Sequence, residues 1–246
     1  APIRAFRRLF AGEGIEVTLA ECRRPMGSEK REHIRQMLAM PRIRDAWLLA
    51  RGEAPHEADI ERLYRDFVPI QIECIRDGAV LIPGMARVAR ELAGRGIRLG
   101  ANTGYSRDMV AELVQRAAEQ GYAPEVVITA SEVRRGRPWP EMSLQAACAL
   151  EASAVQACVK VDDTGVGIAE GLNAGMWTVA LAVSGNEVGL PLEDWQALAP
   201  DERQRLRERA RARLAASGAH YVIDTIAELI PVIDDIEARL ARSERP

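Results

Sequence analysis

Apolar side chains recur at intervals of three and four residues along the first third of the chain, up to about residue 80. The spacing is clear in Ile34, Met37 and Leu38, and it returns between residues 60 and 67. Because this interval places side chains on one face of a helix, the pattern predicts helices and no strand. Turn signals that divide the segment into several helices occur at Pro25-Met26-Gly27, Gly52 to Pro55 and Asp77-Gly78.

From about residue 80 onward the pattern changes to short β-prone runs that alternate with amphipathic helical segments. Such alternation is typical of a parallel sheet covered by helices, so we expect an α/β fold. Ligands of these sheets bind at the carboxyl ends of the strands. The expected strands are Ile97 to Gly100, Val126 to Thr129, Ala157 to Val161, Thr178 to Val183 and His220 to Ile223.

Composition and charge narrow the class of partner. A chain of 246 residues, 48% hydrophobic and 28% charged, is long enough for one large domain or for a main domain with a smaller insertion. A net charge of -3 gives no electrostatic reason to expect a nucleic acid. Cys22, Cys74, Cys148 and Cys158 are widely spaced, which favours reduced thiols over zinc or disulfides. No apolar run reaches membrane-spanning length, so we expect a cytoplasmic protein with a small-molecule partner and no membrane.

Three polar motifs follow the first, second and third expected strands, so their loops converge at one edge of the sheet. These motifs are Thr103-Gly104-Tyr105, Gly136-Arg137-Pro138 and Asp162-Asp163-Thr164. The Thr103 hydroxyl and the Gly104 amide are fixed donors of the kind that bind phosphoryl oxygens. The Arg137 guanidinium can clamp a phosphonate bidentately. The alternatives are a capped turn and a surface arginine.

Asp163 lies at the carboxyl end of an expected strand, where its carboxylate can bind a hard cation such as Mg2+ together with substrate phosphate. The alternative is a helix N-cap for the segment that starts near Gly165. Asp162 is expected to point to the opposite side if the strand geometry persists, so it is only a tentative second metal ligand.

Lys30 and His33 are three residues apart in a helical segment, so their side chains share one face and can exchange a proton. A lysine attacks an aldehyde only if burial or a neighbouring cation lowers its pKa. His33 would then serve as acid and base. The alternative is a solvated helix face, because Glu29, Arg31 and Glu32 surround the pair.

Taken together and in this order, the motifs resemble the phosphonoacetaldehyde hydrolases of the haloacid dehalogenase superfamily, over essentially the whole chain. The segments that carry the resemblance are Arg24-Pro25-Met26-Gly27-x-x-Lys30-x-x-His33, Thr103-Gly104-Tyr105, Gly136-Arg137-Pro138-Trp139-Pro140, Lys160-Val161-Asp162-Asp163-Thr164 and Glu170 to Val179.

The resemblance implies a Rossmann-like core with a helical cap inserted after the first strand. It divides the chain into a core remnant helix at 1–14, a cap at 15–75 and an α/β core at 76–246. It also implies a homodimer formed through the cap. The apolar helix faces between residues 60 and 72 are compatible with such a dimer, although core packing explains them equally well.

The resemblance implies a chemistry as well. Lys30 forms an imine with phosphonoacetaldehyde, His33 shuttles the proton and Met26 lies nearby. Thr103, Gly104, Tyr105 and Arg137 bind the phosphonate group, and Asp163 holds Mg2+. A core aspartate takes the phosphoryl group and is then hydrolysed, which gives acetaldehyde and phosphate.

Two departures from the family pattern affect this expectation. The Asp-x-Ala-Gly-Thr segment with the nucleophile has no counterpart, and Ala1-Pro2 look like the residues just after it. We therefore expect the nucleophile and one central strand to precede Ala1. Without that strand the sheet would have a gap with unpaired backbone groups on both sides. Without the nucleophile the fragment would be inactive. The second acidic metal position falls on Gly167, so its ligand is lost or supplied by Asp162 or another group.

Two other functions remain open at this point. A generic phosphatase of the same superfamily would act on phosphate esters and would not need Lys30. A non-catalytic ligand-binding remnant would follow if the protein truly began at residue 1.

Overall fold

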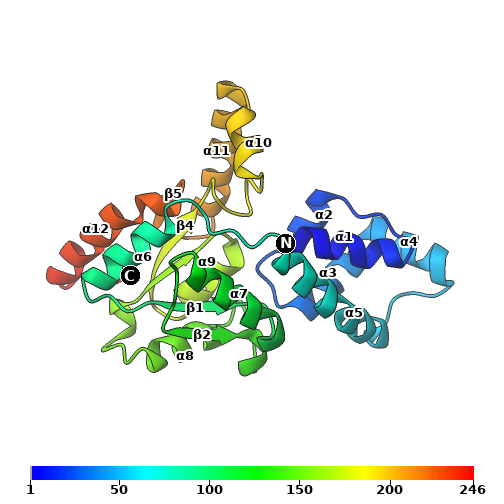
Figure 1. Ribbon diagram of the computed structural model, residues 1–246, viewed down its shortest axis with the longest axis horizontal. Helices are drawn as coiled ribbons and strands as arrows, with labels where there is room; N and C mark the ends of the chain where they lie inside the picture. The colour runs from blue at the N-terminus through cyan, green and yellow to red at the C-terminus, as the bar shows by residue number, and fades with distance from the viewer. Residues whose placement is uncertain (1) are drawn as a thin grey trace.

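The computed structural model describes residues 2–246 and has two parts, a helical body and an α/β core (Figure 1). The helical body is formed by the first five helices, which match the predicted absence of strands up to residue 80. These helices are α1 (Pro2–Gly12), α2 (Leu19–Arg23), α3 (Lys30–Ala39), α4 (Pro41–Arg51) and α5 (Glu57–Arg76).

One apolar cluster holds the helical body together. The α1 helix packs along α5, and α3 packs on both α4 and α5. Phe6, Phe67 and Trp47 are almost completely buried between them. The α1 helix was expected to belong to the core, but its apolar face lies in this cluster, because Phe6 and Phe10 fill the space beside α5. The division of the chain into domains otherwise stays a prediction.

The α/β core contains five parallel strands with helices between them, so the expected α/β class with a helical cap is confirmed. The strands are β1 (Gly100–Thr103), β2 (Val126–Thr129), β3 (Val159–Asp162), β4 (Trp177–Leu181) and β5 (Tyr221–Ile223). The helices are α6 (Met85–Gly94), α7 (Arg107–Glu119), α8 (Glu141–Ala149), α9 (Gly165–Asn173), α10 (Leu192–Ala197), α11 (Pro200–Ala215) and α12 (Leu229–Ala241). Short 3-10 turns occupy Ala130–Glu132, Val155–Ala157 and Ile226–Glu228.

The first strand was predicted three residues too early. The apolar run from Ile97 to Leu99 lies before β1, and the strand itself is Gly100–Thr103. Its inward side chain, Asn102, is polar and hydrogen-bonded, so hydrophobicity does not reveal the strand. The other four expected strands overlap β2 to β5 within two residues at each end.

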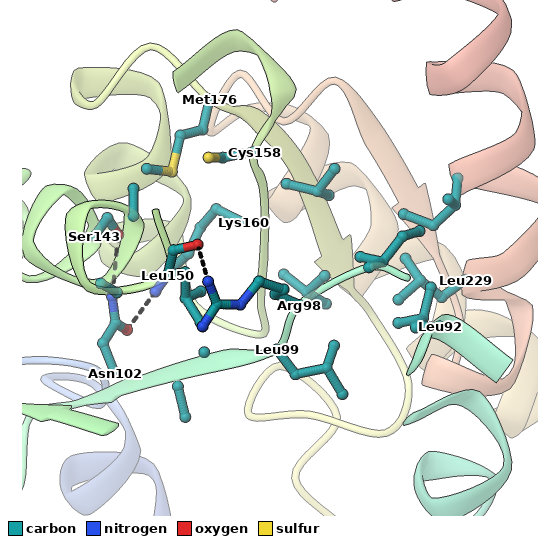
Figure 2. A pocket seen from close by; sticks show the side chains of 18 of the residues that line it. Leu92, Arg98, Leu99, Asn102, Ser143, Leu150, Cys158, Lys160, Met176 and Leu229 are labelled. Atoms are coloured by element: carbon teal, nitrogen blue, oxygen red, sulfur yellow. Dashed lines mark hydrogen bonds between the residues drawn. The ribbon is translucent and has the colours of Figure 1, made fainter. Parts of the chain in front are cut away.

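The strands form two separate sheets, with orders β1-β2 and β3-β4-β5. Within the described part of the chain, β1 pairs only with β2, and the outer edge of β3 has no strand partner. A cavity of about 820 Å³ lies between β1 and β3 and is lined mainly by apolar side chains such as Leu92, Leu99 and Leu229 (Figure 2). The gap lies where the resemblance expects the first strand of the core.

Two helices, α10 and α11, extend away from both sheets in Figure 1. Among residues 2–246, no helix is long and apolar enough to cross a membrane.

Candidate active site

A small cavity of about 200 Å³ lies where the loop before α3 meets the carboxyl ends of the core strands. It is much smaller than the apolar cavity between the sheets, but convergent polar groups line it, which is the property expected of a binding site. It brings together most of the residues predicted from the sequence: Met26, Lys30, Thr103, Gly104, Tyr105, Arg137 and Asp163. His33 and Asp162 lie outside its lining.

The two walls of this cavity approach each other at glycines. Gly27 has a positive φ of 94°, and a Cβ at this position would lie 2.6 Å from the Thr164 hydroxyl oxygen. A Cβ on Gly104 would lie 2.7 Å from the Ser28 carbonyl oxygen. Because real Cβ atoms do not approach other atoms so closely, both glycines are needed for the helical body to close on the core.

Lys30 begins α3 and is 4% exposed, which rules out the solvated helix face considered from the sequence. Its Nζ lies 5.2 Å from the centroid of the Tyr105 ring and 5.9 Å from that of Phe6. Burial, together with the charge of Arg137, lowers the pKa of Lys30 to about 8. The amine is therefore neutral, and nucleophilic, in an appreciable fraction of molecules near pH 7 to 8.

The nearest acid in the sequence, Glu29, does not neutralise this lysine. Its carboxylate caps α3 by accepting hydrogen bonds from the backbone amides of Arg31 and Glu32, at 2.8 and 3.1 Å. No ion pair to Lys30 exists among the residues that the structure describes. The Glu29 carboxylate thus caps the helix instead of forming an ion pair that would stabilise the charged form of Lys30.

His33 lies behind Lys30, fully buried and stacked on Phe6 with ring centroids 3.9 Å apart. Its Nε2 is 3.0 Å from the Cys22 carbonyl oxygen, and because a carbonyl only accepts, Nε2 carries the proton. Burial and the nearby Lys30 lower the pKa of His33 to about 2. The ring is therefore neutral, and its Nδ1 lone pair is buried without a partner within residues 2–246.

Tyr105 and Thr103 complete the wall beside Lys30. The Thr103 hydroxyl oxygen accepts a hydrogen bond from the Tyr105 amide at 3.2 Å, so the hydroxyl proton remains available to a ligand. Burial raises the pKa of Tyr105 above its usual value, so its ring stays neutral beside the amine.

Asp163 lines the small cavity, and its carboxylate accepts a hydrogen bond from the backbone amide of Asn186 at 2.8 Å. Burial and the neighbouring Asp162 raise the pKa of Asp163 to about 6. A divalent cation would relieve both effects, so this carboxylate fits one Mg2+ ligand that is completed by substrate oxygens. No group of three or more His, Cys, Asp and Glu side chains suited to a metal occurs in the described residues.

Asp162 points away from Asp163, as the strand geometry predicted. It accepts hydrogen bonds from the Thr164 amide and hydroxyl, at 3.0 and 2.7 Å, and lies 3.3 Å from Arg137. A Cβ on Gly167 would be 2.0 Å from the Asp162 carboxyl carbon. The Asp162 carboxylate therefore occupies the space of any side chain at 167, and its partners describe a buried ion pair, not a ligand that faces the cavity.

Arg137 is 10% exposed and belongs to a buried network that sequence reasoning missed. Its Nε donates to Glu170 at 2.9 Å, and its Nη2 donates to the Asn102 side chain at 2.6 Å. Lys160 joins the same group, 3.0 Å from Glu170. The missed signal was composition: Glu170 is the single charged residue in α9, whose remaining residues are Gly, Ala, Asn and aliphatic. A lone carboxylate in such a helix indicates buried partners.

Comparison with known proteins agrees with the class that the fold and the site define. Residues 3–175 match the family model described as haloacid dehalogenase-like hydrolase. A β-phosphoglucomutase from Clostridium difficile has the same fold, with a TM-score of 0.67 at 15% identity over 97% of this chain and 90% of that one. The fold class is thus shown independently of any close relative.

More similar relatives narrow the family. Curated phosphonoacetaldehyde hydrolases from Hahella chejuensis and Paraburkholderia xenovorans are 52% and 46% identical over all of this chain, which spans 84% and 92% of their lengths. A crystal structure of a phosphonoacetaldehyde hydrolase-like protein from Oleispira antarctica is 53% identical, with a TM-score of 0.98, over 100% of this chain and 89% of that one. The chain belongs to the phosphonoacetaldehyde hydrolase family of the haloacid dehalogenase-like hydrolases, which confirms the resemblance seen in its motifs.

Proposed function

We propose that this site hydrolyses the carbon–phosphorus bond of phosphonoacetaldehyde, giving acetaldehyde and phosphate, with Lys30 as the amine that forms an imine. The proposal depends mainly on Lys30, a buried amine that lines the cavity of about 200 Å³ and whose pKa is lowered to about 8. The names of the relatives support the choice of substrate.

In the first step the neutral Lys30 amine attacks the aldehyde carbon, and water leaves as the imine forms. His33 lies on the same face of α3 as Lys30, and its buried Nδ1 carries a lone pair that can accept a proton in this step. Its pKa of about 2 makes the ring neutral near pH 7 and a weak base, so it holds no proton to donate at the start of this step. Arg137 and the Thr103 hydroxyl hold the phosphonate oxygens while the imine forms.

In the second step the carbon–phosphorus bond breaks. The bonding electrons move into the protonated imine, so the carbon leaves as an enamine, while the phosphoryl group passes to a carboxylate. Water then hydrolyses the acyl phosphate, and a second water releases acetaldehyde from Lys30. One water is released and two are consumed, which balances the overall hydrolysis. Asp163 would hold Mg2+, which when bound neutralises charge on the phosphoryl oxygens.

The accepting carboxylate is proposed to come from a strand that fills the gap between β1 and β3. Asp163 is the only carboxylate that lines the small cavity in the described part of the chain, and it is assigned to the metal. The gap is bounded by the unpaired edges of β1 and β3, and its polar end at Asn102 and Lys160 lies beside Arg137. A strand that ended there would bring its last side chains next to the phosphoryl site.

Hydride trapping tests the proposal directly. The chain contains only two lysines, Lys30 and Lys160, so peptide mapping after borohydride reduction with phosphonoacetaldehyde has few sites to separate. We expect the reduced adduct on Lys30 and none on Lys160, whose ammonium is held by carboxylates. The Lys30→Arg variant is the matched control and should show no adduct. An unmodified Lys30 in the parent chain would exclude the imine mechanism.

The same variant separates this function from that of a generic phosphatase. If the site acted only on phosphate esters, Lys30→Ala would spare turnover of such an ester. In a protein that also supplies the proposed accepting carboxylate, we expect it to abolish cleavage of phosphonoacetaldehyde, measured as acetaldehyde released.

We also propose a homodimer formed through the helical body, in a cytoplasmic protein. The α5 face between residues 60 and 72 is largely used for internal packing, since Ile60 and Phe67 are buried. Leu48 and Leu49 on α4 are 49% and 90% exposed and offer an apolar surface instead. Sedimentation of the parent chain and of Leu49→Glu tests this surface, and a dimer that withstands Leu49→Glu would exclude it.

A further inference from the structure

Glu170 is the centre of a hydrogen-bonded network below the small cavity, and no predicted role accounts for it. Its side chain is completely buried in α9. A buried carboxylate without partners costs several kcal/mol, so its position requires compensating donors. The structure supplies four of them.

The four donors come from four different parts of the core. Oε1 accepts from the Asn102 side chain at 2.8 Å and from the Ser143 amide at 3.1 Å. Oε2 accepts from Arg137 Nε at 2.9 Å and lies 3.0 Å from Lys160 Nζ. Glu170 therefore joins β1, β3, α8 and the loop before α8 to α9, and both of its oxygens are fully used.

Asn102 links the same groups from the opposite side. Its Oδ1 accepts from Arg137 Nη2 at 2.6 Å and from Lys160 Nζ at 2.5 Å, while its Nδ2 also donates to the Ser143 hydroxyl at 3.0 Å. Figure 2 shows the side chains of Asn102, Ser143 and Lys160 turned toward one another at the edge of the large cavity.

This arrangement leaves one edge of the Arg137 guanidinium free. Nε is bound to Glu170, and Nη2 is bound to Asn102 and lies 3.3 Å from Asp162. Nη1 has no protein partner within residues 2–246, and Arg137 lines both the small cavity and the large one. A guanidinium held by two of its three nitrogens cannot rotate, so the orientation of the third is fixed.

We propose that Glu170, supported by Asn102, is a positioning residue that fixes the guanidinium of Arg137 for binding a phosphoryl or phosphonate group. The inference rests on the proposed role of Arg137 in phosphoryl binding and adds the residue that controls it. Glu170 does not touch the substrate; it acts through the orientation of Arg137.

A double-mutant cycle with inorganic phosphate as the probe tests the inference, with calorimetric Kd values for the whole chain. Glu170→Gln keeps the size of the side chain but replaces a charged acceptor with an amide. We expect it to weaken phosphate binding about tenfold, the effect of losing one charge-assisted hydrogen bond to Arg137. In an Arg137→Ala background, the same substitution should change the affinity less than about twofold, because coupled residues are not additive.

Asn173→Ala is the matched control, because Asn173 lies in the same helix and donates to the Pro138 carbonyl at 2.8 Å without touching the guanidinium. It should leave phosphate affinity within about twofold of the parent. If Glu170→Gln does not fold, as judged by thermal unfolding, Asn102→Ser removes the other anchor and should weaken binding about threefold through Arg137 alone.

Two results would overturn the inference, and they are separate from failure of the proposed function. An unchanged affinity in Glu170→Gln, with binding weakened in Arg137→Ala, would show that Arg137 needs no positioning by Glu170. Equal losses from Glu170→Gln in both backgrounds would show that Glu170 acts by another route. If the parent does not bind phosphate, or Arg137→Ala binds it normally, the proposed phosphoryl site itself is wrong.

Discussion

The two lysines of the chain, Lys30 in the helical body and Lys160 in the core, are both buried but have opposite surroundings. Lys160 lies 3.0 Å from Glu170 and 3.4 Å from Asp162, so carboxylates compensate its charge. Lys30 has aromatic rings and a cation near it, and its neighbouring acid is used as a helix cap. Burial is common to both, so the two amines differ in their charged partners.

The two surroundings fit a structural role for Lys160 and the chemical role proposed for Lys30. Burial and the charge of Arg137 act against the charged form of each, and they lower the pKa of both. At Lys160, Asp162 and Glu170 oppose this effect directly. At Lys30, among the described residues, the charge of Glu29 opposes this effect and is the smallest of the three contributions. Lys30, the lysine proposed to react, thus has no carboxylate partner among residues 2–246.

The largest expected difference between the two lysines is in how their replacement changes the free energy of unfolding. Lys160→Met leaves Glu170 and Asp162 with one cation fewer, and should lower the free energy of unfolding by about 3 kcal/mol. Lys30→Met removes a buried amine that has no carboxylate partner among residues 2–246. The folded pKa of Lys30 lies below the unfolded value of about 10.4, so protonation favours the unfolded state as pH falls. At pH 7, Lys30→Met should therefore raise the free energy of unfolding by about 2 kcal/mol.

Urea unfolding of both variants at pH 7 and pH 10 measures this difference. The gain from Lys30→Met should shrink toward pH 10, because the parent then loses its penalty for a buried charge. Similar losses in both variants at pH 7 would contradict the contrast between the two sites.

Contact between the helical body and the core should depend on Gly27. Gly27→Ala places a Cβ at a φ of 94° and 2.6 Å from the Thr164 hydroxyl, so it should destabilise the closed arrangement by about 2 kcal/mol. We expect hydride trapping at Lys30 to fall with it, because the amine becomes solvated. Gly14→Ala, at a φ of 76° but with open space around it, is the control for backbone strain alone. Equal trapping in the two variants would argue against a role for closure.

The charges near Lys30 should move its titration in opposite directions. Arg137 lowers the pKa of Lys30 and Glu29 raises it. Arg137→Gln should therefore shift the pH midpoint of hydride trapping above 8, and Glu29→Gln should shift it below 8, each by less than about one pH unit. Midpoints that moved the same way would mean that burial of the amine, not local charge, had changed.

The smallest expected effect concerns a residue outside both lysine sites. Arg31→Ala removes a guanidinium that lies 2.8 Å from Glu61 at the surface, where both side chains are nearly half exposed. An exposed pair of this kind contributes less than about 1 kcal/mol, so unfolding and trapping should both stay near parent values. A larger loss would show that Arg31 supports the site, for example through its stacking on Tyr64.

Much of the fold was predictable, because helices and buried strands leave a periodic pattern. The apolar stripe of α5 and the fully buried run of β4 are examples. The start of β1 was not predictable, since Asn102 replaces an apolar side chain with a hydrogen-bonded one. The packing of α1 with the helical body also depends on contacts between Phe6 and Phe67 that are distant in sequence.

The site could be predicted only in part, because some of its contacts also join residues that are distant in sequence. Motif order found the loops that line the small cavity, because strand ends converge in any parallel sheet. It did not find Glu170, whose environment depends on donors from three elements and a loop. It also could not show that Glu29 would cap α3 instead of pairing with Lys30, because both are ordinary behaviours of a glutamate at a helix start.

The most direct test of the central claim is the pKa of Lys30 itself. Because the chain has only two lysines, NMR of protein labelled at the lysine ε-carbon should give two signals, and Lys160→Arg assigns them. We expect the Lys30 signal to titrate with a midpoint near 8. A Lys30 midpoint at the ordinary value of about 10.4 would contradict it, because the amine would then be a charged group at neutral pH and a poor nucleophile.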